Sequence, residues 1–181
     1  MIDEPSASRR AARIPTAFHV LLCLCACSAC GQQAAIPVAD VPPVISSRVP
    51  AARIKTSSVL GQFNADGILR AAEPGWHADS PPVYPQWIEI SFDEMQNIHG
   101  LALLPQDGNS RRAPREIRIA MSSDGGEWTL LTAIADACNR TGDTWRSHPL
   151  PLPVATMHLR LTILSNCGDR RFLTLRGLRV E

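Results

Sequence analysis

Two polar segments, residues 106–112 and 166–172, carry the side chains of this chain that best suit ligand recognition. Both contain arginine and asparagine, whose planar groups offer hydrogen-bond donors and acceptors, and the second ends on the apolar ring of Phe172. An apolar platform with a few placed polar groups is the usual composition of a small-ligand site. A sugar ring, which has an apolar side and a rim of hydroxyls, matches that chemistry. The alternative is that both segments are solvated loops and that Phe172 belongs to the core.

The sequence lacks the common catalytic motifs. The histidines at His77, His99, His148 and His158 are scattered, and none has the His-x-x-x-His spacing of a metal pair. No Gly-x-Ser-x-Gly elbow and no phosphate-binding glycine loop occurs. The formal net charge of +1 argues against a dedicated nucleic-acid-binding protein. We therefore expect a protein that is not an enzyme and does not bind nucleic acid.

Residues 1–30 have the composition of an export signal. Three arginines, the last at Arg13, precede an apolar stretch from Ala17 to Ala29 that ends in small residues. This stretch is shorter than the ~20 apolar residues that span a bilayer. We therefore expect an exported chain that does not cross the membrane through this segment.

Four of the six cysteines crowd into this N-terminal stretch. Cys30 follows Ser28 and Ala29, and the segment resembles a bacterial lipobox whose cysteine receives a lipid. Cys27 is the alternative lipidation site, and an ordinary cleaved signal is a further alternative. On the lipobox interpretation the chain is tethered through Cys30 in the periplasm or at the outer membrane, and it meets the membrane only through that anchor.

The other two cysteines, Cys138 and Cys167, lie in the remainder of the chain. An exported protein sits in an oxidising compartment, where disulfides form and persist. We predict that Cys138 and Cys167 pair, and the alternative is two free buried thiols. A bridge between them would join segment 136–142 to segment 166–172 and would rigidify a ligand site there.

The chain divides into three parts. After residues 1–30, residues 31–52 form a Pro/Ala-rich linker whose prolines preclude a stable helix. Residues 53–181 contain short runs that alternate apolar and polar residues, which is typical of antiparallel strands with one buried face. Asp-Gly pairs and other turn signals separate the runs, as at Asp124-Gly125. The inward residues of the clearest runs are predicted to be Ile88, Ile90, Phe92; Ile117, Ile119, Met121; and Leu159, Leu161, Ile163.

The last strand and the tryptophans carry further expectations. Leu173 and Leu175 share one side of the final run, whereas Leu178 and Val180 share the other, and a bulge at Gly177 would restore the inward register. We expect three tryptophans in the core, and leave the fourth, Trp145, unassigned. The three are Trp76, Trp87 and Trp128.

Together these segments resemble a discoidin domain, the coagulation-factor type C family that overlaps the family 32 carbohydrate-binding modules. The resemblance spans roughly residues 53–181 and implies an all-β, eight-stranded antiparallel jelly-roll sandwich with a galactose-binding-like fold. It rests on an ordered set of motifs, none specific by itself. They are Ser57-Ser58, Asp66-Gly67, Trp76-His77-Ala78, Gln86 to Phe92, Ile98 to Pro105, Ile117 to Trp128, Leu159 to Ile163 and Leu173 to Val180.

The resemblance also implies where a ligand binds. Members of the family bind glycans, phospholipid surfaces or proteins through loops at one end of the sandwich, and segments 106–112 and 166–172 correspond to such loops. The ligand-binding residues that this implies are Asn109, Arg111, Asn166, Arg170 and Phe172, with His77 as an outlying candidate.

Many members of the family also hold a structural Ca²⁺ beside an Asp-Gly turn, which here places Asp66 as a metal ligand. Calcium needs six to eight oxygen ligands. The sequence departs from the family pattern nearby, because Pro74 stands where a hydroxyl residue is common and Arg176 stands near the usual glutamate. The alternative is that Asp66 only caps a turn.

The function that follows is a non-catalytic module of the bacterial envelope or exterior that recognises carbohydrate. The alternative is an adaptor lipoprotein that binds another envelope protein and has a degenerate ligand site.

Overall fold

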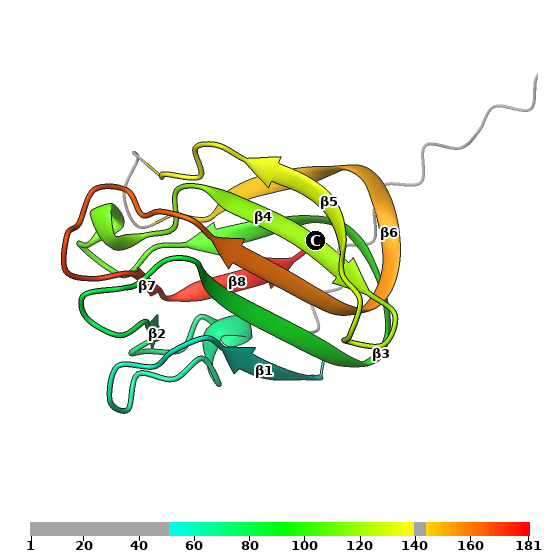
Figure 1. Cartoon of the computed structure of the whole chain (residues 1–181), viewed down its shortest axis with the longest axis horizontal. Helices are drawn as coiled ribbons and strands as arrows, with labels where there is room; N and C mark the ends of the chain where they lie inside the picture. Colours follow the sequence, from blue (N-terminus) through cyan, green and yellow to red (C-terminus); the bar gives the residue numbers. More distant parts are fainter. Residues whose placement is uncertain (1–50, 140–143) are drawn as a thin grey trace, which may run out of the picture. The chain divides into compact units, whose positions relative to one another are not determined.

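The computed structural model describes residues 51–139 and 144–181, which form a β-sandwich with two short 3-10 helices (Figure 1). Every strand pair is antiparallel. The strands are β1 (Ala52–Thr56), β2 (Trp76–His77), β3 (Gln86–Leu104), β4 (Ile117–Ser122), β5 (Thr129–Ile134), β6 (Arg146–Ile163), β7 (Thr174–Leu175) and β8 (Gly177–Val180). The 3-10 helices are η1 (Ile68–Arg70) and η2 (Ser110–Arg112).

The larger sheet has the strand order β1-β3-β6-β4-β5, and β8 also pairs with β3. The smaller sheet pairs β2 with β7. The long strands β3 and β6 curve through the molecule (Figure 1). The first part of β3 pairs with β1 and with the end of β6, whereas its last part pairs with β8 and with the start of β6. Register shifts after Ser91 and after Ile98 accompany this change of partners, as is usual where a strand passes from one layer to the other.

The predicted alternation places the core between the layers. Most of the predicted inward residues are at most 2% exposed, which confirms the strand periodicity. Met121 is the exception: it is half-buried, and its neighbour Ser122 is buried instead. The pairing of β4 with β5 shifts register after Ile119, whereas its pairing with β6 is continuous from Ile117 to Ser122.

Two of the predicted core tryptophans lie on the outer face of the sheet. Trp76 is fully buried as expected, but Trp87 and Trp128 are half-buried. Trp87 directly precedes buried Ile88, so the pleat turns its ring outward. The Arg160 guanidinium lies 5.7 Å from the Trp87 ring centroid and 4.0 Å from that of Trp128, a cation–π arrangement.

The chain changes sheets at the end of β7. Leu175 pairs with Trp76 in the smaller sheet, and after Arg176 the chain enters β8, where Leu178 pairs with Leu103 of β3. The predicted change of parity at Gly177 is therefore a change of partner strand and not a bulge within one strand. A Cβ atom at Gly177 would lie 2.7 Å from Cη2 of Trp145 and 2.9 Å from Cβ of Ala71, so only glycine fits there without a shift.

The predicted export signal, lipidated Cys30 and most of the linker lie outside the described residues. Among residues 51–139 and 144–181, no helix is long and apolar enough to cross a membrane.

Candidate ligand-binding loops

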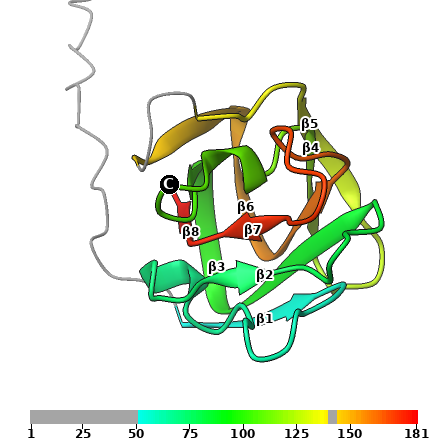
Figure 2. The same ribbon diagram turned by 90° about the vertical axis from the view of Figure 1, so that its left-hand side faces the viewer.

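Two loops lie side by side at one end of the sandwich, which Figure 2 shows facing the viewer. Loop A is residues 106–116, and loop B is residues 164–172. The N–H of Arg115 donates to the carbonyl of Ser165 at 2.8 Å, and that of Leu164 donates to Glu116 at 2.8 Å. Further along, the N–H of Cys167 donates to the carbonyl of Ala113 at 3.0 Å. These bonds fix the two loops relative to each other.

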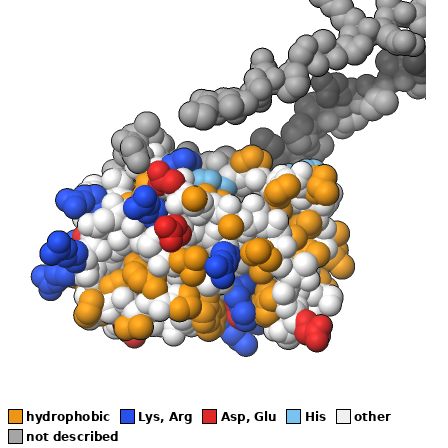
Figure 3. Space-filling model, turned by 45° about the horizontal axis from the view of Figure 1, so that its top comes forward, with side chains coloured by type: hydrophobic (Ala, Val, Ile, Leu, Met, Phe, Trp, Pro, Cys, Tyr) orange, Lys and Arg blue, Asp and Glu red, His pale blue; other side chains and the backbone are white. Residues whose placement is uncertain are grey.

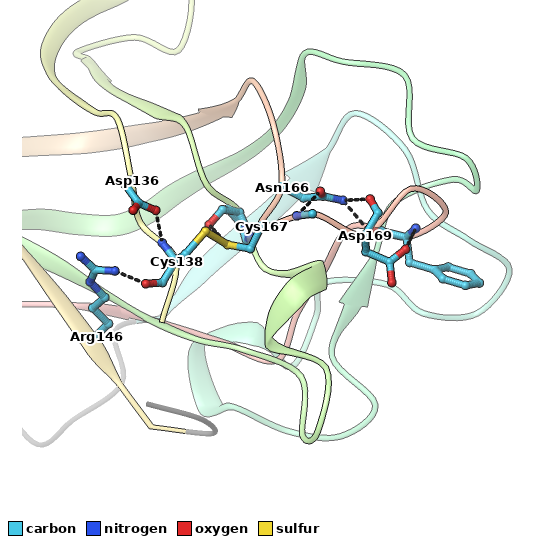
Figure 4. The surroundings of a disulfide bond; sticks show 9 residues. Asp136, Cys138, Arg146, Asn166, Cys167 and Asp169 are labelled. Carbon is cyan, nitrogen blue, oxygen red and sulfur yellow. Dashed lines mark hydrogen bonds between the residues drawn. A yellow bond between two sulfur atoms is a disulfide. The ribbon is translucent and has the colours of Figure 1, made fainter. Parts of the chain in front are cut away.

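The predicted disulfide is present and adds a third segment to this end. Cys138, which follows β5, is bonded to Cys167 of loop B with an S–S distance of 2.05 Å (Figure 4). The N–H of Ala137 also donates to the carbonyl of Arg115 at 2.8 Å. Residues 137–138 are thus covalently tied to loop B and hydrogen-bonded to loop A.

Asn166 shapes loop B from within. Its side-chain Nδ2 donates to the carbonyl of Asp169 at 2.6 Å and to that of Phe172 at 2.8 Å, and its Oδ1 accepts from the N–H of Gly168 at 3.0 Å. Figure 4 shows the Asn166 amide turned into its own loop. Asn166 was predicted to bind a ligand, but in this structure its amide holds the turn that presents Phe172.

Asp169 completes the turn. Its Oδ1 accepts from the N–H of Arg171 at 2.8 Å and from that of Phe172 at 2.9 Å, and its Oδ2 accepts from Nε of Arg112 at 3.3 Å. Burial raises the pKa of Asp169, but the hydrogen bonds from the two N–H groups and from Arg112 outweigh burial and lower that pKa below its ordinary value. Asp169 is therefore an anion that joins loop B to loop A.

Phe172 lies half-buried beneath arginine side chains. The guanidinium of Arg112 is 4.4 Å from the ring centroid, and that of Arg171 is 5.3 Å away. Arg112 was not among the predicted site residues, although it is next to Arg111. Its distinguishing feature, the pairing with Asp169, comes from contact between the two loops and has no signal in the local sequence.

The other predicted residues are distributed around this centre. Arg111 is exposed, and its Nη2 donates to the carbonyl of Gly168 at 3.2 Å. Arg170 is exposed on loop B. Asn109 directly precedes η2, and its Nδ2 donates to the carbonyl of Asp107 at 3.0 Å, so it caps a turn within loop A.

His77 reaches the same end from β2. It pairs with Thr174, two residues beyond Phe172, and its ring stacks on Phe63 with 4.3 Å between centroids. Burial lowers the pKa of His77; the amide of Gln106 opposes this effect and the Arg112 cation adds to it. His77 is therefore uncharged at neutral pH. The structure thus brings all six predicted residues to one end, and of these Asn109 and Asn166 use their amides within their own loops.

An open cavity of about 300 Å³ lies next to the disulfide. Ser110, Arg111 and Arg115 of loop A line it, together with Asp136 and the two bridged cysteines. Two arginines and one carboxylate therefore border a hollow whose walls are held by the disulfide and by the backbone bonds between the loops. The sequence alone did not indicate this cavity, because its lining comes from three separated segments.

The surroundings of Asp66 do not resemble a calcium site. Asp66 is exposed, and its backbone N–H donates to Oδ1 of Asn64 at 3.1 Å. Nowhere in the described part of the chain do three or more His, Cys, Asp or Glu side chains gather closely enough to hold a metal ion. The nearby carboxylates Glu73 and Asp107 instead contact the guanidinium of Arg176. The side chain that caps this turn is that of Asn64, and calcium binding at Asp66 stays a prediction.

Comparison with known proteins identifies the family of this chain and solved structures with a similar fold. The family model of the F5/8 type C domain matches residues 53–175, more than half of the chain. No curated protein matches the chain. Among solved structures, the F5/8 type C domain of a Bacteroides fragilis protein is 14% identical with a TM-score of 0.62, covering 72% of this chain and 90% of that one.

Two carbohydrate-binding modules are similar to a comparable degree. The family 32 module of Clostridium perfringens NanJ, solved with galactose, is 16% identical with a TM-score of 0.58 and covers 71% of this chain and 92% of that one. A chitosan-binding module from Paenibacillus sp. is 18% identical with a TM-score of 0.59 and covers 74% and 95%. At these identities the likeness establishes the fold, and the predicted antiparallel jelly-roll sandwich is confirmed.

Proposed function

Because the chain belongs to the F5/8 type C (discoidin) domain family, we propose that it is a non-catalytic module that binds carbohydrate through loops A and B. The observation that carries this proposal is the placement of Phe172. Its ring lies at the loop end of the sandwich, and the internal bonds of Asn166 and Asp169 hold it there before any ligand arrives. A prepositioned aromatic ring lowers the entropic cost of binding.

The polar groups around the ring suit sugar hydroxyls. The guanidinium groups of Arg112 and Arg171 lie within 5.3 Å of the ring centroid. Guanidinium groups donate in a fixed planar geometry. Apolar stacking on Phe172 with hydrogen bonds from its neighbours is the combination that a sugar ring requires.

The proposal includes the cellular setting suggested by the N-terminal sequence. We place the module outside the cytoplasm, tethered by a lipid on Cys30 through the linker at residues 31–52. The Cys138–Cys167 disulfide supports an oxidising compartment.

The test is affinity electrophoresis and glycan-array binding of the full chain. We expect retention on at least one polysaccharide, and we expect Phe172→Ala to weaken it by about tenfold or more, since stacking contributes on the order of 1–2 kcal/mol. Arg170→Ala removes an exposed side chain of loop B, so the fold should be kept and a loss of glycan binding can be attributed to the site. Arg53→Ala on the exposed face of β1 is the matched control and should bind normally. A folded chain that no glycan retains would remove the proposal.

One observation favours a second candidate, an adaptor that binds another envelope protein. The amide of Asn166 is used within its own loop, and Arg112 covers part of Phe172, so fewer groups are free for a sugar. An adaptor should keep its partner after Arg111→Ala and Phe172→Ala, whereas a glycan-binding module should lose its ligand. Crosslinking of the wild-type and variant chains in cell envelopes distinguishes the two.

A further inference from the structure

Arginine side chains gather on loops A and B. Figure 3 shows Lys and Arg side chains collected at the left-hand edge of the molecule, the end that carries these loops in Figure 1. Four of the arginines on the two loops are solvent-exposed. They are Arg111, Arg115, Arg170 and Arg171.

The two loops carry fewer acidic residues than arginines. Loops A and B contain three acidic residues, Asp107, Glu116 and Asp169, and five arginines. Asp107 contacts the guanidinium of Arg176 outside the loops, and Asp169 pairs with the less exposed Arg112. Within residues 51–139 and 144–181, no carboxylate forms an ion pair with any of the four exposed arginines. Their charge is therefore available to a ligand.

Two of the four arginines border the cavity beside the disulfide. Arg111 is steadied by its bond to the carbonyl of Gly168, and the backbone of Arg115 is bonded on both sides, to Ser165 and to Ala137. Among the described residues of the lining, Asp136 is the one carboxylate. Its Oδ1 accepts from the N–H of Cys138 at 3.2 Å. The described part of the lining thus carries two arginines and one carboxylate, and the backbone of each arginine segment is held in place.

We propose that the carbohydrate is an acidic polysaccharide, and that Arg111 and Arg115 bind one of its carboxylate or sulfate groups at this cavity. The inference rests on the proposed function, and it adds the chemical class of the ligand. Planar guanidinium groups pair with carboxylate and sulfate oxygens through two parallel hydrogen bonds. Loops A and B carry both Phe172 and the cavity, so a polymer that stacks a sugar on the ring can place an acidic group of the same chain between the arginines.

An anionic membrane is the competing partner for a cluster of arginines. Binding to a lipid surface is strengthened by apolar side chains that enter it. Only one of the four exposed large hydrophobic residues, Val83 at 77% exposure, lies in a loop near this end, where Ser80 bonds to the carbonyl of Arg171. The others, Met95, Leu130 and Leu152, belong to β3, β5 and β6. The surface is therefore better suited to a soluble polyanion.

The experiment compares matched acidic and neutral polymers with the full chain. Polygalacturonate is paired with its methyl ester, and dextran sulfate with dextran, so that the two pairs separate carboxylate from sulfate. We expect binding to at least one acidic polymer to be ten times tighter or more than to its neutral partner, and to weaken as salt is raised. Arg111→Gln with Arg115→Gln should reduce that affinity about tenfold, since charged hydrogen bonds are lost.

Arg53→Gln with Arg179→Gln removes the same charge from exposed strand positions and should leave binding unchanged. Phe172→Ala should weaken binding to the acidic polymer as well, which a purely ionic attraction does not predict. Binding to phosphatidylserine vesicles is measured in parallel, because an anionic membrane is the competing partner.

Each other outcome overturns a defined part of the inference. Neutral polymers bound as tightly as acidic ones, with loss only in Phe172→Ala, would overturn the acidic ligand and leave the proposed function standing. Acidic binding that survives the Arg111/Arg115 change would overturn the assignment of the cavity. Tighter binding to the vesicles than to any polysaccharide would show that the ligand of these arginines is a membrane and not an acidic polysaccharide. Failure to bind every polymer and vesicle would remove the proposed function as well.

Discussion

Asp169 is the residue on which the geometry of loop B depends most. Its two carboxylate oxygens receive two backbone N–H groups and the Nε of Arg112. Because the side chain is only 24% exposed, these bonds are partly shielded from water. One carboxylate therefore holds the turn before Phe172 and links it to loop A.

The effect of pH on stability follows from the lowered pKa of Asp169. A carboxylate whose folded-state pKa lies below its unfolded value, about 3.9 for aspartate, stabilises the protein above that value. Its contribution is lost as the pH falls through the folded-state pKa. We expect Asp169→Asn to lower the free energy of unfolding by about 1 kcal/mol at pH 7. The difference from wild type should shrink below pH 4.

Urea denaturation at pH 7 and at pH 3 measures this difference. Asp93→Asn, at an exposed position of β3, is the control and should match wild type at both values. If Asp169→Asn loses the same free energy of unfolding at both pH values, the charge of Asp169 does not contribute to stability.

At the scale of elements, backbone hydrogen bonds and an ion pair join loops A and B into one unit. Backbone bonds link Arg115 to Ser165 and Cys167 to Ala113, and the ion pair links Arg112 to Asp169. The disulfide then ties loop B to the segment after β5. Loops with few buried contacts of their own need such connections to hold a binding geometry.

Removal of the disulfide tests this unit. Cross-linking cysteines 29 residues apart restricts the unfolded chain, which corresponds to a stabilisation of about 3–4 kcal/mol. We expect Cys138→Ala with Cys167→Ala to lose about that much, and to bind polysaccharide more weakly because the cavity wall is released. Thermal and urea unfolding with and without dithiothreitol give the comparison. If the reductant leaves wild-type stability unchanged, the bridge does not form in the isolated protein.

At the scale of the whole molecule, the described residues form a sandwich with loops A and B at one end (Figure 2). The chain enters β1 at residue 52, after the proline-rich linker. On the proposed function, this linker would connect the module to a lipid on Cys30 and let it reach ligands near the membrane. The site of the anchor is thus part of the proposed function.

Metabolic labelling with a palmitate analogue tests the anchor. We expect the full chain to be labelled and to fractionate with membranes when made in a bacterium that processes lipoproteins. Cys30→Ser should abolish both properties, whereas Cys27→Ser should keep them. The reverse pattern would assign the lipid to Cys27, and an unlabelled, soluble wild-type chain would indicate an ordinary cleaved signal.

The buried side of most strands can be predicted from local patterns in the sequence. Alternating runs such as Ile88 to Phe92 define which side of a strand is buried, because side chains on a strand point to opposite faces in turn. The same rule places Trp87 on the outer face, because it directly precedes buried Ile88, so the prediction of a core position for Trp87 was wrong. Met121 departs from this rule at the end of β4, where its neighbour Ser122 is buried instead, and the local pattern does not indicate this.

The sequence by itself determined the strand periodicity, the family and the candidate loops, because these depend on residues close together in the chain. Only the tertiary structure decided what the loop residues do. Asn166 turns inward because carbonyl groups of its own loop lie within reach, and Arg112 gains its role from Asp169, 57 residues away. The cavity between Arg111, Arg115 and the disulfide likewise exists only once three distant segments meet, since its walls are made by packing and not by any one motif.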